Sequence, residues 1–279
     1  MRLVRQLVAV AVVTAIGGRT VAAVQEGSPW LTLVLGVTTS VLALLVYRWV
    51  VRRTEHRAVT EVGRKGAAAG LGLGTLLGLG LFGAVIANIA FLGYYEVTGR
   101  GSLSGAAGLL GLMAAAAVTE ELLFRGVLFR VLEERMGTWT AMALSGVLFG
   151  AFHLANPDAD LYGALAIAVE AGGMLTAAYV ATRRLWVPIG VHFGWNFAAS
   201  GLFSTEVSGN GSTHGLLESV TSGPAFVTGG AFGPEGSPYA LLFCALTAVV
   251  FLLVARRRGR LVPRRGRTER VAAVATLSR

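Results

Sequence analysis

The chain has 279 residues, of which 54% are hydrophobic and only 14% are charged, and its mean hydropathy is +0.66. Soluble domains carry about 25% charged residues, so this composition excludes a soluble globular enzyme. A membrane-crossing helix needs about 20 apolar residues, which leaves room for about eight crossings. The net charge of +9 lies almost entirely in the segment 256–279, with nine Arg and one Glu, and this arrangement indicates membrane orientation, with no nucleic-acid partner.

Eight apolar stretches follow one another along the chain, each close to the length of a bilayer crossing. They are 7–24, 30–47, 67–94, 105–130, 138–155, 161–181, 186–203 and 238–255. Arg2 and Arg5 precede the first stretch as in a signal peptide, but no clear small-residue cleavage site follows, so we interpret it as a retained helix. The predicted fold is an all-α, polytopic transmembrane helix bundle.

The basic residues are distributed one-sidedly between the stretches. With the N-terminus inside, 21 of the 24 Lys and Arg residues fall in cytoplasmic segments. The positive-inside rule then predicts that both termini are cytoplasmic. The outer loop 204–237 has no Lys or Arg and is rich in Gly, Ser and Thr, so we expect a flexible cap. A single Lys beside 23 Arg favours a bacterial source, and hence the plasma membrane.

Three regions divide the chain. Residues 1–66 hold two spans and a basic cytoplasmic loop, 67–255 form the transmembrane core, and 256–279 form an Arg-rich cytoplasmic tail. The glycine-rich run 70–80 predicts close helix packing, because small residues let transmembrane helices approach one another. No strand precedes this run and no Lys-Ser/Thr follows it, so we do not interpret it as a phosphate-binding loop.

Charged residues gather in the fourth stretch, although a charge at the bilayer centre costs roughly 2.5 to 3.5 kcal/mol. Glu121 and Arg125 are one helical turn apart, so we expect them to pair on one face. Glu120 is rotated about 100° from Glu121 and has Phe at position 124, where a cation could have paired with it. We therefore predict that Glu120 faces other polar groups.

The fifth and seventh stretches supply further polar side chains. His153 follows Phe149 by one turn, and Asn196 follows His192 by one turn, so each pair shares a helix face. Any one of these residues could simply join two helices by a hydrogen bond. Glu120, His153, His192 and Asn196 together, on three separate stretches, favour a functional cluster.

The other unusual residues are interpreted as structural. Glu170 is a lone carboxylate in the sixth stretch. Cys244, the single cysteine, lies in an apolar run, so it forms no intramolecular disulfide and is expected to pack in the interior. His56 and His214 lie in predicted loops, where we assign them no role.

The motifs Glu-Glu-x-x-x-Arg at 120–125, Phe-x-x-x-His at 149–153 and His-x-x-x-Asn at 192–196 resemble those of the CAAX-processing and bacteriocin-processing (CPBP, or Abi) intramembrane glutamic endopeptidases. They occur in the family's order, and the resemblance covers about 105–203. It implies a membrane protease that hydrolyses peptide bonds. The supporting residues that it implies are Glu121 and Arg125, which would hold the helix in place, and Phe149.

Peptide hydrolysis needs an activated water and a stabiliser for the tetrahedral oxyanion. Glu120 with His153 can supply the first, and His192 with Asn196, on one helix face, can supply the second. The resemblance implies the same allocation. We therefore predict Glu120, His153, His192 and Asn196 as the catalytic residues.

A zinc site built from the same residues stays open as an alternative. Two His and one Glu form a recognised catalytic zinc set, here Glu120, His153 and His192. The His-Glu-x-x-His motif is absent, however, and Asn is a poor zinc ligand beside His and Glu. We favour activation of water by glutamate, with no metal and no other cofactor.

Two other classes of function compete with an endopeptidase. An ion- or proton-coupled transporter would also place carboxylates and histidines at mid-bilayer, but the sequence shows no inverted repeat. A non-catalytic membrane adaptor would use the same residues only to join helices. The partners expected are the lipid bilayer and a membrane-associated protein or peptide substrate, whose identity no feature selects.

The depths of the two histidines conflict on ideal helices. His153 is near the outer end of its span, whereas His192 is near the inner end of a parallel span, a separation of about 14 Å. A cluster therefore requires a span that is short, tilted or broken. Pro188, just before His192, would permit such an irregularity.

Overall fold

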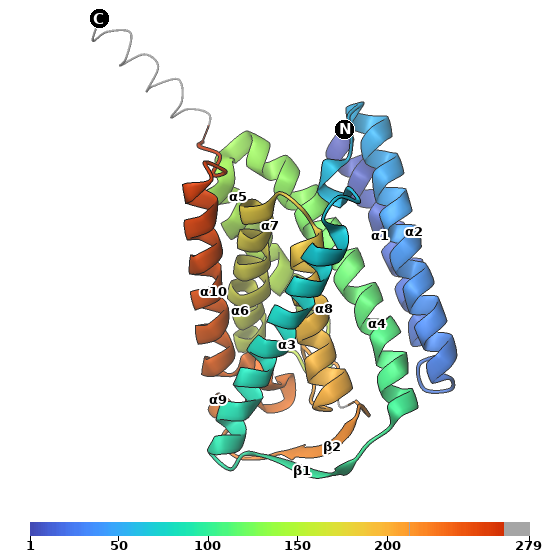
Figure 1. Cartoon of the computed structure of the whole chain (residues 1–279), viewed down its shortest axis with the longest axis vertical. Helices are drawn as coiled ribbons and strands as arrows, with labels where there is room; N and C mark the ends of the chain where they lie inside the picture. The colour runs from blue at the N-terminus through green and yellow to red at the C-terminus, as the bar shows by residue number, and fades with distance from the viewer. Residues whose placement is uncertain (212, 265–279) are drawn as a thin grey trace, which may run out of the picture.

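The computed structural model describes residues 1–211 and 213–264, and within them the chain forms the predicted all-α bundle. Figure 1 shows long helices side by side, with the N-terminus and the end of the last helix at the same end of the molecule. A short pair of strands crosses the opposite end. We refer to these as the terminal end and the strand end.

The helices begin and end close to the predicted bounds. The long helical segments are α1 (Arg2–Ala22), α2 (Pro29–Glu55), α3 (Ala67–Phe91), α4 with η2 (Leu103–Glu121 and Leu122–Phe129), α5 (Arg130–His153), α6, η3 and α7 (Leu161–Val169, Glu170–Leu175 and Thr176–Thr182), α8 with η4 (Trp186–Phe197 and Ala198–Leu202) and α10 (Pro238–Arg257). The short elements are η1 (Thr60–Val62), β1 (Tyr95–Arg100), β2 (Leu217–Thr221), α9 (Ala225–Thr228), η5 (Gly230–Phe232) and η6 (Pro234–Gly236).

Six helical stretches within the described ranges are long and apolar enough to cross a membrane. One of them, Leu103–His153, contains the fourth and fifth predicted spans, which are separated by a break at Gly137 with φ 79°. The seventh predicted span, α8 with η4, is helical but short. All eight predicted stretches are therefore helical, and the number of crossings stays a prediction. The predicted tail lies outside the described residues from 265 onward.

Several helices that start at the strand end begin with a side-chain cap. Ser28, Ser102 and Ser237 accept hydrogen bonds from backbone N–H groups three residues on, and Asp160 accepts one from Gly163 N–H at 2.6 Å. Such caps satisfy N–H groups that have no partner within the helix. They mark where α2, α4, α10 and α6 start.

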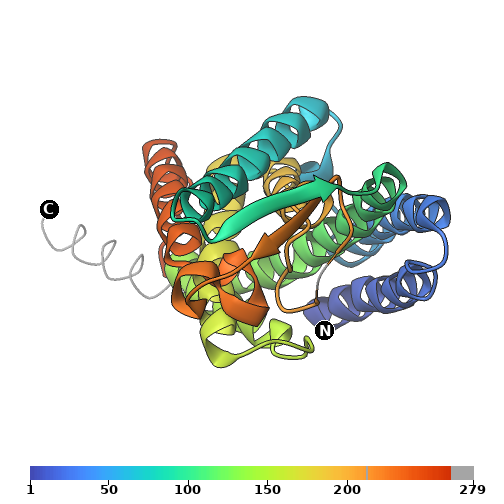
Figure 2. The same ribbon diagram turned by 90° about the horizontal axis from the view of Figure 1, so that it is seen from below.

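The predicted outer loop 204–237 forms regular structure in its described residues, where its composition had suggested a flexible cap. β2 lies within this loop and pairs antiparallel with β1, Tyr95 opposite Thr221 and Arg100 opposite Leu217. Figure 2, seen from below, shows the two strands crossing the ends of the helices beside α9. Backbone pairing and the short helices between 225 and 236 give the segment an ordered structure despite its small residues.

Small residues set the closest helix contacts, as the glycine-rich run predicted. Gly74 and Gly78 of α3 face the backbone of α8, and Gly190 and Gly194 of α8 face the backbone of α3. A Cβ at any of these positions would collide with main-chain atoms of the other helix. This contact fixes α8, the helix that carries His192 and Asn196.

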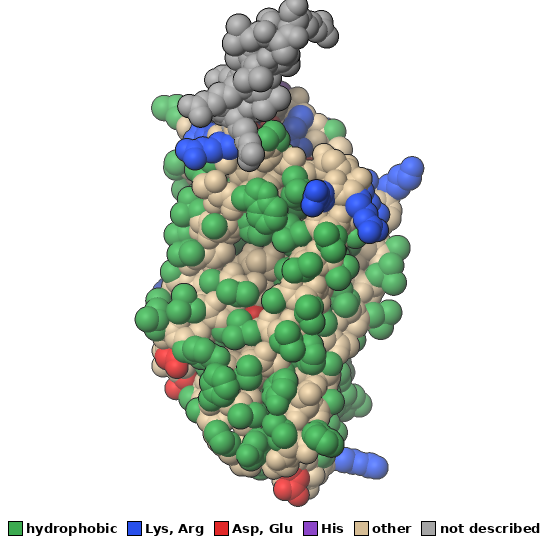
Figure 3. Space-filling view, turned by 90° about the vertical axis from the view of Figure 1, so that its left-hand side faces the viewer, with side chains coloured by type: hydrophobic (Ala, Val, Ile, Leu, Met, Phe, Trp, Pro, Cys, Tyr) green, Lys and Arg blue, Asp and Glu red, His purple; other side chains and the backbone are tan. Residues whose placement is uncertain are grey.

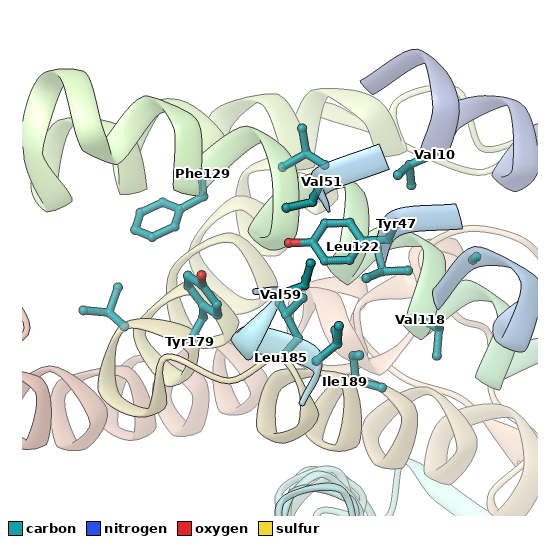
Figure 4. Packing of buried hydrophobic residues seen from close by; sticks show 14 of the residues in the cluster. Val10, Tyr47, Val51, Val59, Val118, Leu122, Phe129, Tyr179, Leu185 and Ile189 are labelled. Carbon is teal, nitrogen blue, oxygen red and sulfur yellow. The ribbon is translucent and has the colours of Figure 1, made fainter. Parts of the chain in front are cut away.

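An apolar cluster fills the terminal half of the bundle. Figure 4 shows Tyr47, Leu122, Tyr179 and Leu185 among side chains from α2, η2, α7 and the start of α8. Tyr47 points its hydroxyl out of this cluster toward Glu61 of η1, which accepts the hydrogen bond at 2.7 Å. The cluster holds the segment after Glu121 against the N-terminal helices.

Candidate active site

Glu120, His153 and His192 come together from α4, α5 and α8. The Nε2 atoms of His153 and His192 lie 3.9 and 3.8 Å from Glu120 Oε2. Both imidazoles are buried, whereas the Glu120 side chain is 18% exposed. These separations are longer than hydrogen bonds, and Glu120 Oε2 has no hydrogen-bond partner among the described residues. The carboxylate therefore has an acceptor site free between two imidazoles.

The other nitrogen of each imidazole is bonded to an acceptor. His153 Nδ1 lies 2.8 Å from the Phe149 carbonyl oxygen, and His192 Nδ1 lies 3.0 Å from Glu121 Oε1. A carbonyl or carboxylate oxygen only accepts, so each Nδ1 carries the proton and donates it. In a neutral imidazole, Nε2 is then the unprotonated nitrogen. The Nε2 atom of each histidine, 3.8 to 3.9 Å from Glu120 Oε2, therefore accepts a hydrogen bond when the imidazole is neutral and donates one when it is protonated.

The predicted pair of Glu121 and Arg125 is present. Arg125 Nη1 lies 2.6 Å from Glu121 Oε1, and both side chains are at most 1% exposed. The same oxygen accepts from His192 Nδ1, a contact that helix spacing could not reveal. Glu121 therefore connects α4 to α8 as well as to its own helix.

The remaining donors of Arg125 bind η3 and α7. Its guanidinium donates to the Ala171 carbonyl and, at 3.3 Å, to Thr176 Oγ1. Its Cζ atom lies 4.5 Å from the centre of the Phe149 ring, and that centre lies 4.7 Å from the centre of the His153 ring. Phe149, predicted as a supporting residue, thus fills the space between the ion pair and one imidazole. No motif or spacing in the sequence singles out Thr176.

Wide π-helical turns occur next to several of the polar residues. η2 begins directly after Glu121, η3 begins at Glu170, and η4 begins two residues after Asn196. Such turns displace the regular hydrogen-bond ladder and are frequent at functional sites. The Ala171 carbonyl in η3 is the one that Arg125 reaches. The helices are thus irregular around the cluster.

The conflict in histidine depth is resolved by the position of α8. Figure 1 shows α8 starting deeper in the bundle than α5, and Leu185, which precedes it, is fully buried. Leu185 N–H donates to the Glu61 carbonyl, so the chain enters α8 from beneath η1. The prediction that Pro188 permits an irregularity in this span is not met at that residue. Pro188 lies in the first turn of α8, where its missing N–H leaves no bond unmade.

A cavity lies beside the two imidazoles and has room for a few water molecules. His153, His192 and Asn196 line it, whereas Glu120 lies outside its wall. Asn196 thus shares a surface with His192, as predicted from their spacing. Glu170, which we interpreted as structural, also lines the cavity and is 3% exposed.

The outer loop contributes residues that sequence reasoning missed. Glu235 is 4% exposed, lines the cavity and accepts from Trp195 Nε1 at 2.7 Å. It also accepts from the Ser208 backbone N–H at 2.5 Å and from Ser208 Oγ at 2.8 Å. Glu235 is one of three Glu residues in the loop, and nothing in the sequence distinguishes it from Glu206 or Glu218.

The donor set has the chemistry of a zinc site, but its spacing is wider than direct ligation requires. In the part of the chain that the structure describes, no three His, Cys, Asp or Glu side chains form a group that could hold a metal ion. Glu120, His153 and His192 would have to move closer together to ligate one. The choice between glutamate and zinc chemistry therefore belongs to experiment.

Fold and site together define a helical membrane protein with a buried cluster of Glu, His and Asn. Residues 102–198 match the family model described as "Type II CAAX prenyl endopeptidase Rce1-like". The match runs from the cap of α4 past Asn196 and so includes all three motifs. It confirms the family resemblance predicted from those motifs over this segment.

A curated relative is similar to part of the same chain. It is the Bacillus subtilis (strain 168) protein named "Putative membrane peptidase YdiL", which is 33% identical over 79 residues. The alignment covers 28% of this chain and 30% of the relative, so the chain spans less than a third of the length of the protein it matches. No solved structure matches the chain.

Proposed function

We propose that the protein is an intramembrane endopeptidase that hydrolyses peptide bonds of a membrane-associated protein or peptide, in a bacterial plasma membrane. The observation that carries this proposal is the free Oε2 of Glu120, 3.8 and 3.9 Å from the Nε2 atoms of two buried histidines. The family match over residues 102–198 supports the reaction class.

In the proposed reaction, a water lies between Glu120 Oε2 and His153 Nε2. Both atoms accept hydrogen bonds, so they orient the two water hydrogens, and Glu120 takes one proton as the water oxygen attacks the carbonyl carbon. The carbon–nitrogen bond then breaks, and the proton passes to the leaving amine. One water is consumed, and a carboxyl group and an amine are released.

His192 and Asn196 are proposed to stabilise the oxyanion that forms in this step. This role requires the protonated form of His192, in which Nδ1 donates to Glu121 and Nε2 donates to the oxyanion. The Asn196 side chain lines the same cavity and supplies an amide N–H. Removing one such donor typically lowers kcat by about 10²- to 10³-fold.

The decisive experiment compares membrane proteomes of cells that carry the wild-type protein or Glu120→Gln. The substitution keeps the size of the side chain but removes the base, so an uncleaved membrane-associated substrate should accumulate. Glu218→Gln, on the exposed face of β2, makes the same change of charge away from the site and serves as the control. A Glu120→Gln proteome identical to wild type would contradict the proposal and favour a transporter or an adaptor.

Chelation then separates the two ways of activating water. Purified protein should cleave the substrate at an unchanged rate in EDTA or phenanthroline, because Glu120 and His153 act directly on the water. Activity that is lost with chelator and restored by stoichiometric zinc would instead identify Glu120, His153 and His192 as metal ligands.

A further inference from the structure

One more buried carboxyl group faces the cavity, and the proposed reaction does not use it. Glu170 lies at the first position of η3, where the helix widens, and is 3% exposed. Its Oε1 atom has no hydrogen-bond partner among the described residues. The side chain shares the cavity with His153 and His192. Glu170 thus has a carboxylate oxygen without a hydrogen-bond partner, in a side chain that lines the same cavity as the candidate catalytic residues.

The described residues that line the cavity include no Lys or Arg to pair with Glu170. Arg125 donates to the neighbouring Ala171 carbonyl, but it is already bonded to Glu121 and Thr176. Glu235, the other carboxylate in the wall, accepts from Trp195 and Ser208. Among the described residues, Glu170 is therefore the carboxyl group of this wall that has an oxygen without a hydrogen-bond partner.

The rest of the wall near Glu170 is mainly apolar. It is formed by Ile167, Met174, Leu175, Val191 and Cys244. A buried polar group without a partner costs free energy, and an unpaired buried charge costs far more. A group that brings a positive charge and N–H donors into this cavity would remove that cost. Because the cavity holds only a few waters, the group must be narrow.

We propose that Glu170 is a specificity-determining residue that pairs with an ammonium group of the substrate, best supplied by a Lys side chain near the scissile bond. The methylene stem of Lys suits the apolar part of the wall, and its ammonium would pair with the Glu170 carboxylate. A free carboxylate at the same place would meet Glu170 and Glu235 and is disfavoured. This inference rests on the proposed function, because the ammonium group is supplied by the peptide that the protein is proposed to cleave.

The test uses three acetylated and amidated apolar peptides that differ only in a central Lys, norleucine or Glu. Binding is measured by microscale thermophoresis on the full chain in detergent micelles, with Glu120→Gln present so that no peptide is consumed. Cleavage of the same peptides by the chain with Glu120 intact is followed by mass spectrometry. The matched variants are Glu170→Gln in the cavity and Glu218→Gln on the exposed strand.

The Lys peptide should bind roughly ten- to a hundredfold more tightly than the norleucine peptide, with the Glu peptide weakest. Glu170→Gln should abolish this advantage, and Glu218→Gln should keep it. Equal or absent binding of Lys and norleucine peptides to the chain that retains Glu170 overturns the proposal, whether or not Glu170→Gln folds. The proposal is also overturned if folded Glu170→Gln protein still binds the Lys peptide more tightly than the norleucine peptide.

The two proposals fail in distinguishable ways. Preferential, Glu170-dependent binding of the Lys peptide without cleavage of any peptide supports the subsite and counts against proteolysis. Cleavage at equal rates of Lys and norleucine peptides supports proteolysis and overturns the subsite. Unchanged thermal unfolding of Glu170→Gln excludes a general loss of structure as the cause of weaker binding.

Discussion

Glu121 shares one carboxylate oxygen between Arg125 of its own helix and His192 of α8. All three side chains are buried, so each contact is shielded from water. Local spacing accounts for the first contact, since the residues are one turn apart. The second depends on α8 lying beside α4. Adjacent glutamates thus have different surroundings, because Glu120 meets two imidazole nitrogens and, in the part of the chain that the structure describes, no arginine.

Glu121→Gln should lower the folded yield, because it leaves the Arg125 charge buried without its counter-ion. Breaking such a pair typically costs about 3 to 5 kcal/mol. The yield is measured as the monodisperse fraction after size-exclusion chromatography in detergent, with Glu120→Gln as the matched control that should fold normally. Normal yield of Glu121→Gln together with low yield of Glu120→Gln would show that the two roles are reversed.

The double substitution Glu121→Gln with Arg125→Gln should recover part of that yield, because no buried charge is left unpaired. Proteolytic activity should not recover, because His192 loses its charged acceptor. Both quantities are measured on the same preparation. A double variant no better folded than Glu121→Gln alone would mean that the cost does not come from the unpaired charge.

At the scale of the helices, glycine contacts decide where the polar residues lie. α8 is short, starts inside the bundle and packs backbone against backbone on α3 through glycines on both helices. Gly194 lies between His192 and Asn196 along the chain, and its partner in α3 is the backbone of Thr75. The π-helical turns η2, η3 and η4 adjust the neighbouring helices around this fixed element.

Gly194→Ala should destabilise the fold by about 1 to 3 kcal/mol, because the added methyl group meets backbone that cannot move aside. Ala stabilises a helix better than Gly does where nothing obstructs it, so a loss of stability would identify the close contact with α3 as the cause. Gly80→Ala in α3, where a Cβ meets nothing within 4 Å, is the control and should be neutral or stabilising. Thermal unfolding in detergent measures both. Equal midpoints would exclude close packing at Gly194.

At the scale of the whole molecule, charge separates the two ends. Figure 3 shows Lys and Arg gathered mainly near the terminal end, hydrophobic side chains over the middle, and acidic side chains near the strand end. The terminal end also holds partly buried ion pairs, in which Glu61 accepts from Arg57 at 2.7 and 2.9 Å and Arg130 binds Glu55 at 2.7 Å. This network joins the N-terminal helices to the start of α5, the helix that carries His153.

The prediction that the terminal end is cytoplasmic is tested by cysteine labelling in a Cys244→Ala background. Glu218→Cys on β2 should react with a membrane-impermeant maleimide in intact cells, because β2 is predicted to be external. Arg53→Cys in α2 should react only after the membrane is permeabilised. The opposite pattern would invert the topology.

Acid should weaken the fold through Glu61. Burial raises the pKa of this carboxyl group, but the hydrogen bonds from Arg57 and Tyr47 outweigh burial and leave the pKa below its ordinary value. A carboxyl group whose pKa is lowered in the folded state stabilises that state at pH values above its unfolded pKa. This stabilisation is lost as the pH falls through the folded pKa, so the thermal unfolding midpoint should fall below about pH 4. Glu61→Gln should start from a lower midpoint at neutral pH and fall less in acid. Parallel acid limbs would exclude Glu61 as the cause.

The apolar spans, the faces on which polar residues lie and the pair of Glu121 and Arg125 could be predicted from the sequence, because they depend on composition and helical period. The meeting of Glu120 with His153 and His192 depends on how the helices pack. The depth of a side chain in the bundle depends on where its helix starts and on how closely the glycines let that helix pack. The local spacing of residues contains neither piece of information. The same reason explains why Glu235 reaches the cavity from an outer loop that composition described as a flexible cap.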